Sequence, residues 1–163
     1  AIRKKFPSYK AFAGKTLEEL LSKEQLQQAE VFQTTTFAHI YAEQLADGSF
    51  RITELPWESQ LSPINAMLSM DVDGDERKEV ILGGNQYGFA PNLGRMDAGR
   101  GLIVSYSPSE NQWEVKSIPG FRLKGEVRSL AEVNRKGNFS SKGILAGLNN
   151  NELVLVEVVA NRN

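Results

Sequence analysis

The chain has 163 residues and a net charge of -1, from 19 Lys and Arg against 20 Asp and Glu. This length suits one domain or part of a larger repetitive one, and the balanced charge favours neither nucleic acid nor an anionic membrane as a partner. Cysteine is absent, which excludes disulfides, cysteine-based zinc sites and thiol nucleophiles. No run of about 18 apolar residues is present, so we expect no transmembrane segment.

Residues 1–34 are predicted to form an N-terminal helical segment. Thr16 with Glu19, and Ser22 with Gln25, have the capping-box spacing that satisfies free amides at a helix start. The pattern predicts two short helices or one kinked helix, whose inward-facing apolar residues are Leu17, Leu20, Leu21, Leu26 and Ala29. The basic start of the chain lacks the apolar core of a signal peptide, so an export signal would have to lie upstream.

Residues 35–163 change to short β-rich runs separated by turn residues. Asp47-Gly48 is a hairpin signal, because such a turn requires positive φ. The predicted strands cover 37–44, 49–55, 64–70, 78–83, 102–106, 112–118, 126–133, 143–147 and 152–159. Short strands at this spacing indicate an antiparallel sandwich or a β-propeller.

An internal repeat decides between these two folds. A shift of 63 positions places Ile64–Met70 on Val127–Val133, and Ile81–Gly84 on Ile144–Gly147, with the apolar alternation preserved. The repeating unit predicts a mainly β chain, namely a partial β-propeller of antiparallel four-stranded blades. Two strands of one blade (37–55) precede a full blade (64–118) with an insertion (85–100), and a partial blade (126–159) follows. Propellers need about four to eight blades, so unpaired blade edges could also self-associate.

An acidic loop lies between two predicted strands of the full blade. Calcium takes about six to eight oxygen ligands from a tightly bent loop, and the carboxylates of Asp71, Asp73, Asp75 and Glu79 with the Arg77 carbonyl fit this need. An EF-hand is excluded, because Gly74 is at the fourth position and Leu82 stands where a bidentate Glu is required. The alternative is an acidic turn that binds no metal.

The repeat predicts one calcium site. The positions that correspond to the four carboxylates of the acidic loop are Asn134, Lys136, Asn138 and Lys142. This sister loop keeps a glycine at the bend, Gly137, and loses the negative charge. We therefore expect Lys136 and Lys142 to hold the sister loop through their own contacts, or not at all.

The acidic loop and the insertion also carry a family resemblance. Asp71–Asn85, followed by Tyr87–Pro91, resembles the FG-GAP/VCBS repeats of integrin-α-like propellers. With Gly94–Ala98 and Gly101-Leu102, the chain is most similar to the C-terminal part of bacterial VCBS-repeat proteins akin to cartilage acidic protein. The resemblance implies an extracellular, periplasmic or outer-membrane-associated protein with calcium in its Asp-rich loops and no catalysis from these repeats. Glu76 replaces the usual glycine and Glu79 the usual Asp, so we expect a looser cage or weaker affinity.

The insertion supplies the candidate binding face. Tyr87 and Phe89 could form an aromatic platform or pack the loop down, and Arg95 and Asp97 could bind a partner or pair with each other. His39 is the only histidine and is predicted to be a packed strand residue. We expect an extracytoplasmic, calcium-stabilised propeller module that binds protein or glycan without catalysis. The alternative is a carbohydrate-active propeller enzyme that uses loop 85–100.

Overall fold

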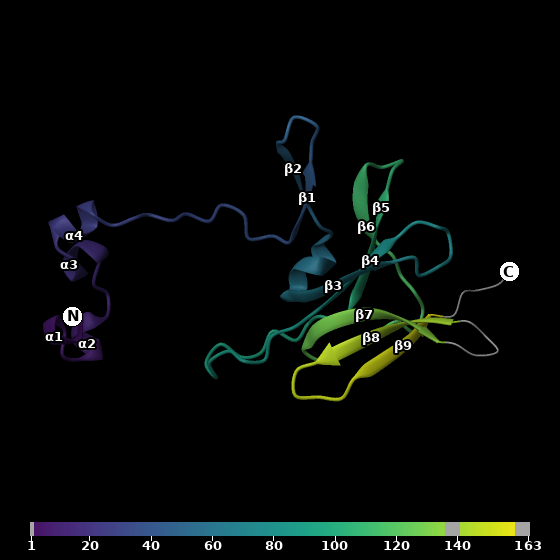
Figure 1. Ribbon diagram of the computed structural model, residues 1–163. Helices are drawn as coiled ribbons and strands as arrows, with labels where there is room; N and C mark the ends of the chain where they lie inside the picture. The colour runs from purple at the N-terminus through teal and green to yellow at the C-terminus, as the bar shows by residue number, and fades with distance from the viewer. Residues whose placement is uncertain (1, 136–140, 159–163) are drawn as a thin grey trace. The chain divides into compact units, whose positions relative to one another are not determined.

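The computed structural model describes residues 2–135 and 141–158 (Figure 1). The chain divides into two compact units, residues 1–37 and 38–163, and each is described by itself. Strands make up 36% of the described residues and helices 14%, which confirms the predicted β class. None of the helices in the described ranges has the length and apolar character needed to cross a membrane.

The first unit contains four short helices. They are α1 (Ile2–Lys5), α2 (Tyr9–Phe12), α3 (Leu17–Leu20) and α4 (Lys23–Gln27). The predicted capping box at α4 is present, because Gln25 N donates to Ser22 Oγ at 3.2 Å and Ser22 N donates to Gln25 Oε1 at 2.9 Å. At α3, Thr16 N donates to Glu19 Oε2 at 2.9 Å.

The predicted apolar face of this segment is only partly correct. Leu20, Leu21 and Leu26 are half-buried, whereas Leu17 and Ala29 are exposed. Helices of four or five residues each span little more than one turn, so they cannot keep one continuous apolar stripe.

The described residues of the second unit form three antiparallel sheets. The first sheet pairs β1 (Ile40–Gln44) with β2 (Phe50–Glu54). The second has the order β3 (Ile64–Met70), β4 (Glu79–Gly84), β5 (Leu102–Ser107) and β6 (Gln112–Val115). The third has the order β7 (Val127–Arg135), β8 (Ser141–Leu148) and β9 (Val154–Val158). Each strand pairs only with its neighbours along the chain (Figure 1). Within the described ranges the sheets do not close into a ring of blades. A 3-10 helix, Trp57–Leu61, was not predicted.

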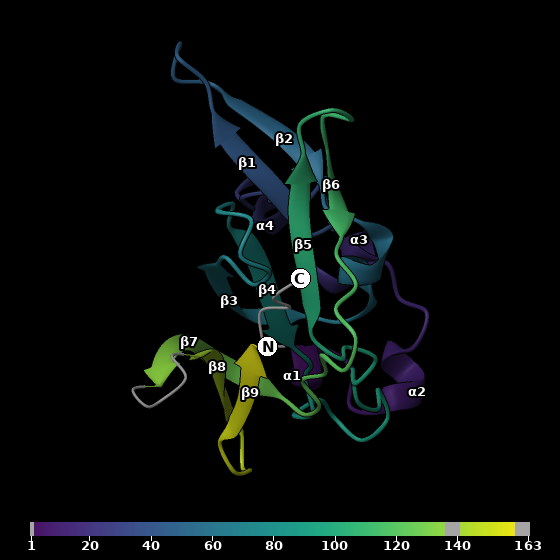
Figure 2. The ribbon, with the colours of Figure 1, turned by 90° about the vertical axis from the view of Figure 1, so that its right-hand side faces the viewer.

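The predicted hairpin is present between β1 and β2. Gly48 has φ +85°, and Leu45 N donates to Ser49 O at 2.8 Å. Figure 2 shows this hairpin and the β5–β6 hairpin. Tyr41 on β1 contacts Trp113 on β6, with ring centroids 5.0 Å apart.

The hydrophobic core lies between the second and third sheets, where β7 runs close to β3 and β4. Gly83 allows this approach, because an added Cβ would lie 2.6 Å from Val127 Cγ1. Two core residues, Met70 and Val72, flank Asp71 and anchor the start of the acidic loop. The buried members are Met70, Val72, Ile81, Ile103, Leu123, Val127, Ile144 and Ala146.

Candidate metal centre

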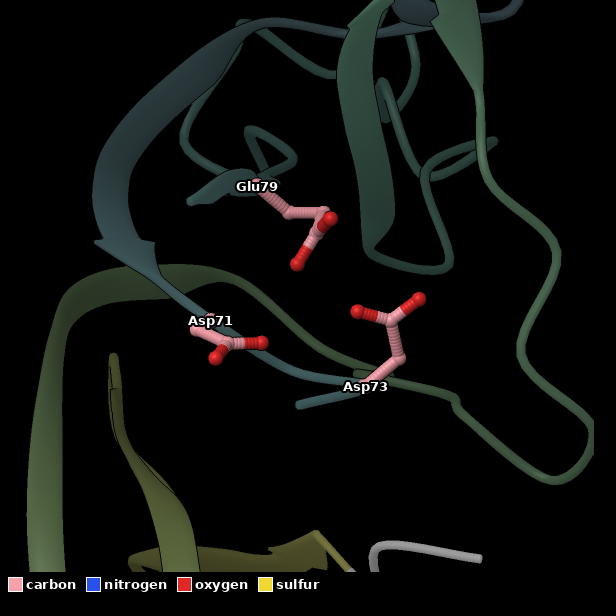
Figure 3. Close-up of side chains that lie close together, drawn as sticks. All are labelled: Asp71, Asp73 and Glu79. Atoms are coloured by element: carbon pink, nitrogen blue, oxygen red, sulfur yellow. The ribbon is translucent and has the colours of Figure 1, made fainter. Parts of the chain in front are cut away.

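Three carboxylates of the acidic loop converge at the β3–β4 corner. Asp71 follows the last residue of β3, and Glu79 is the first residue of β4 and pairs with Met70 across the ladder. One ligand oxygen each from Asp71, Asp73 and Glu79 lies within 4.8 Å of the others. Figure 3 shows the three side chains pointing toward a shared space.

Asp71 organises the turn of the loop. Its Oδ1 accepts from Gly74 N at 2.6 Å, and its Oδ2 accepts from Glu76 N at 3.2 Å. Gly74 and Glu76 both have positive φ, +84° and +69°. Glycine adopts this conformation freely, but a residue with a side chain is strained there. Glu76 therefore has a backbone conformation that glycine usually adopts.

A lysine from another strand lies among these carboxylates. The Lys116 Nζ is 2.5 Å from Asp73 Oδ2 and 2.7 Å from Glu79 Oε1. Glu79 is buried, and its other oxygen accepts from Val72 N at 3.0 Å. Lys116 follows β6 directly, and its backbone N donates to Ile103 O on β5 at 2.8 Å. The sheet therefore holds a positive charge against two of the three carboxylates.

The ionisation of this cluster follows from its contacts. The hydrogen bond from Lys116 holds the pKa of Asp73 below its ordinary value. Burial by itself would lower the pKa of Lys116, but the hydrogen bonds and charges of Asp73 and Glu79 outweigh it and raise that pKa. Both partners are charged at neutral pH, so the contact is an ion pair.

The remaining predicted ligands lie at the edge of the cluster. Asp75 and Arg77 are exposed, and Asp75 Oδ1 accepts from Arg77 N at 2.8 Å. Asp75 is not among the three converging carboxylates. Its role as a ligand, and that of the Arg77 carbonyl, remain predictions.

The donor set fits a hard cation such as calcium. Carboxylate oxygens are the ligands that calcium prefers, and each of the three side chains brings one oxygen to the shared space. An oxygen that accepts one N–H bond keeps a second lone pair, so the loop amides leave the carboxylates able to bind an ion. The Lys116 ammonium already stands in for a cation against Asp73 and Glu79.

The sister corner is built with the opposite charge. Lys142 on β8 stands at the position that corresponds to Glu79. Its Nζ lies 3.8 Å from Glu132 Oε1 on the neighbouring strand β7. Lys136, Gly137 and Asn138 of the sister loop lie outside the described residues.

The insertion after β4 is tied down by its own residues. Gln86 and Met96 exchange backbone hydrogen bonds of 2.8 and 2.9 Å, and the Arg95 guanidinium lies 5.1 Å from the centre of the Tyr87 ring. Arg95 therefore packs on Tyr87, and the described residues contain no Arg95–Asp97 ion pair. Phe89 is 38% exposed and Asp97 is exposed, so both are accessible from solvent.

Two buried polar residues anchor this insertion, and the sequence analysis missed both. The Asn85 Nδ2 donates to Gly99 O at 2.9 Å and to Gly125 O at 2.8 Å. Glu126 accepts from Asn149 Nδ2 at 2.6 Å and from Tyr87 N at 3.2 Å, and the Asn149 bond is the main reason that the pKa of Glu126 is lowered. The only sequence signal was their place at the end of one strand and the start of another.

His39 is half-buried but lies just before β1, so the prediction that it is a strand residue was wrong. Its Nδ1 is 3.0 Å from Ser59 O, which fits the predicted packing role.

The chain matches no family model, no curated protein and no solved structure. The geometry of the loop and of the insertion therefore carries the functional argument.

Proposed function

We propose that loop 71–79 binds one calcium ion as a structural brace in a propeller-type module. The single observation that carries this proposal is the convergence of Asp71, Asp73 and Glu79 within 4.8 Å at a strand corner. The bound ion would neutralise the carboxylates and fix the β3–β4 corner. The module acts outside the cytoplasm by binding a protein or glycan, and it carries out no catalysis of its own.

Strand positions support the propeller part of the proposal. The strands β1, β2, β3 and β4 begin 62 or 63 residues before β5, β6, β7 and β8. The register irregularity between Ile64 and Ala66 in β3 recurs between Val127 and Ser129 in β7, again 63 residues later. The order β3-β4-β5-β6 is also the meander order of a four-stranded blade.

The insertion is the proposed binding face. It continues from the end of β4, the strand that begins with Glu79, and Asn85 holds its base. Phe89, Leu93 and Met96 are 38%, 71% and 49% exposed, which gives the loop apolar surface for a partner. A glycan array and a pull-down with the wild type and a Phe89→Ala variant will test this face, and a hydrolysis screen on the same glycans is expected to show no turnover.

Thermal unfolding in calcium and in EDTA tests the brace. We expect calcium to raise the melting temperature of the wild type, because an ion that binds only the folded state stabilises it by mass action. Asp73→Ala is expected to lose this rise, whereas Asp97→Ala, a carboxylate outside the loop, is expected to keep it. An identical melting temperature of the wild type in calcium and EDTA would contradict the proposal.

A further inference from the structure

We propose that Lys116 is a built-in counter-cation that calcium must displace from the loop. This inference rests on the proposed calcium site and deepens it, because it names the group that regulates occupancy. The loop then has two alternative states, one neutralised by Lys116 and one by the ion. The affinity for calcium then depends on the difference in free energy between these two states.

The positions of the atoms require this exchange. Calcium binds carboxylate oxygens at about 2.3–2.6 Å. The Lys116 Nζ lies 2.5 Å from Asp73 Oδ2 and 2.7 Å from Glu79 Oε1, two of the oxygens available to the ion. An ammonium and a divalent ion cannot both approach the same oxygens this closely, because their charges repel at short range.

Burial explains why a counter-cation is needed at all. Glu79 is 1% exposed, and a buried carboxylate without a partner is costly. Val72 N satisfies one of its oxygens and Lys116 the other. Without calcium, Lys116 therefore neutralises the buried Glu79 carboxylate.

Lys116 is also able to leave. Its side chain is 26% exposed, so the ammonium has access to water, whereas its backbone stays bonded to β5. Rotation of a flexible four-carbon side chain is enough to vacate the oxygens. No strand has to move for the exchange.

The sister corner supplies a matched control residue. Lys142 makes an ion pair with Glu132 across β7 and β8, at 3.8 Å, in a different sheet from the three converging carboxylates. Lys142→Met thus removes the same positive charge as Lys116→Met and likewise keeps an unbranched side chain of similar length, at the sister corner. Any long-range effect of the lost positive charge on calcium affinity will appear in both variants. The effect of removing the group that the ion displaces will appear only in Lys116→Met.

Calorimetric titration of the full chain with calcium chloride tests the inference. We expect Lys116→Met to bind calcium about tenfold more tightly than the wild type, and Lys142→Met to bind as the wild type does. Binding by Lys116→Met where the wild type shows none would contradict calcium binding by the native chain, and with it the exchange at Lys116. Equal or weaker binding by Lys116→Met, with clear binding by the wild type, would overturn this inference alone. Absence of binding by both would overturn the calcium proposal and this inference together.

A measurement on the wild type covers the case in which Lys116→Met fails to fold. Amine acetylation followed by peptide mass spectrometry reports the reactivity of each lysine in EDTA and in calcium. We expect calcium to increase acetylation of Lys116 and to leave Lys142 unchanged, because displacement frees only the first ammonium. Unchanged or reduced reactivity of Lys116 at a calcium concentration that saturates binding would overturn the inference.

Discussion

At the scale of single residues, the acidic loop combines a glycine-type bend with a glutamate. Glu76 has φ +69°, in the region where an L-residue is strained by about 1–2 kcal/mol relative to its usual conformations. Asp71 accepts from the Glu76 amide and so helps to hold the bend. The loop is therefore stable despite this residue, and the strain is stored where the proposed ion binds.

Replacing Glu76 by glycine should release that strain. We expect Glu76→Gly to increase the free energy of unfolding by about 1 kcal/mol, measured by urea denaturation in EDTA, since glycine populates positive φ without cost. Glu76→Gln removes the charge and keeps the strained backbone, so it separates the backbone effect from repulsion among the carboxylates. A Glu76→Gly variant no more stable than Glu76→Gln would contradict the backbone explanation.

At the scale of elements, the end of the β3–β4 ladder opposite the acidic loop depends on a close approach of two backbone segments. A Cβ on Gly84 would overlap the carbonyl oxygen of Pro63. At the corresponding position of the repeat, a Cβ on Gly147 would meet the side-chain oxygen of Ser129, which can rotate away. Two glycines with the same place in the repeat therefore have different structural roles.

Alanine at these two glycines should have unequal effects. We expect Gly84→Ala to lower the free energy of unfolding by about 3 kcal/mol, at the upper end of the cost of overpacking, and Gly147→Ala to lower it by clearly less. Chemical denaturation followed by circular dichroism measures both. Equal losses for the two variants would show that the backbone contact at Pro63 is not the reason for glycine at position 84.

The strands were predictable because their signal is local. Alternation of apolar residues and turn pairs such as Asp47-Gly48 act within a few neighbours, and the structure has β3 at the predicted residues 64–70. The convergence of Asp71, Asp73 and Glu79 could also be expected, since all three lie in one short loop. The prediction that Leu17 and Ala29 face inward was wrong, because helical periodicity applies only where a helix continues for several turns.

Lys116 could not have been found in the same way. It is 37 residues from Glu79 and meets it only because β5 and β6 fold back along β4. Glu126 meets Tyr87 across 39 residues for a similar reason. Contacts between strands depend on register and sheet order, which a single sequence specifies only indirectly.

At the scale of the whole molecule, the proposed calcium loop and the proposed binding face both connect strands of the same four-stranded sheet. The loop precedes β4, the insertion follows it, and the lysine that neutralises the loop follows β6. In the proposed account the ion has a supporting role in the second unit, because the loop begins beside the buried residues Met70 and Val72. The proposed partner then contacts the insertion and not the ion.

A crystal structure of the chain grown with saturating calcium tests this account most directly. We expect one ion bound by oxygens of Asp71, Asp73 and Glu79 at about 2.3–2.6 Å, with the Lys116 ammonium turned away into solvent. A structure at the same calcium concentration in which Lys116 Nζ still bridges Asp73 and Glu79, with no ion beside them, would contradict the account.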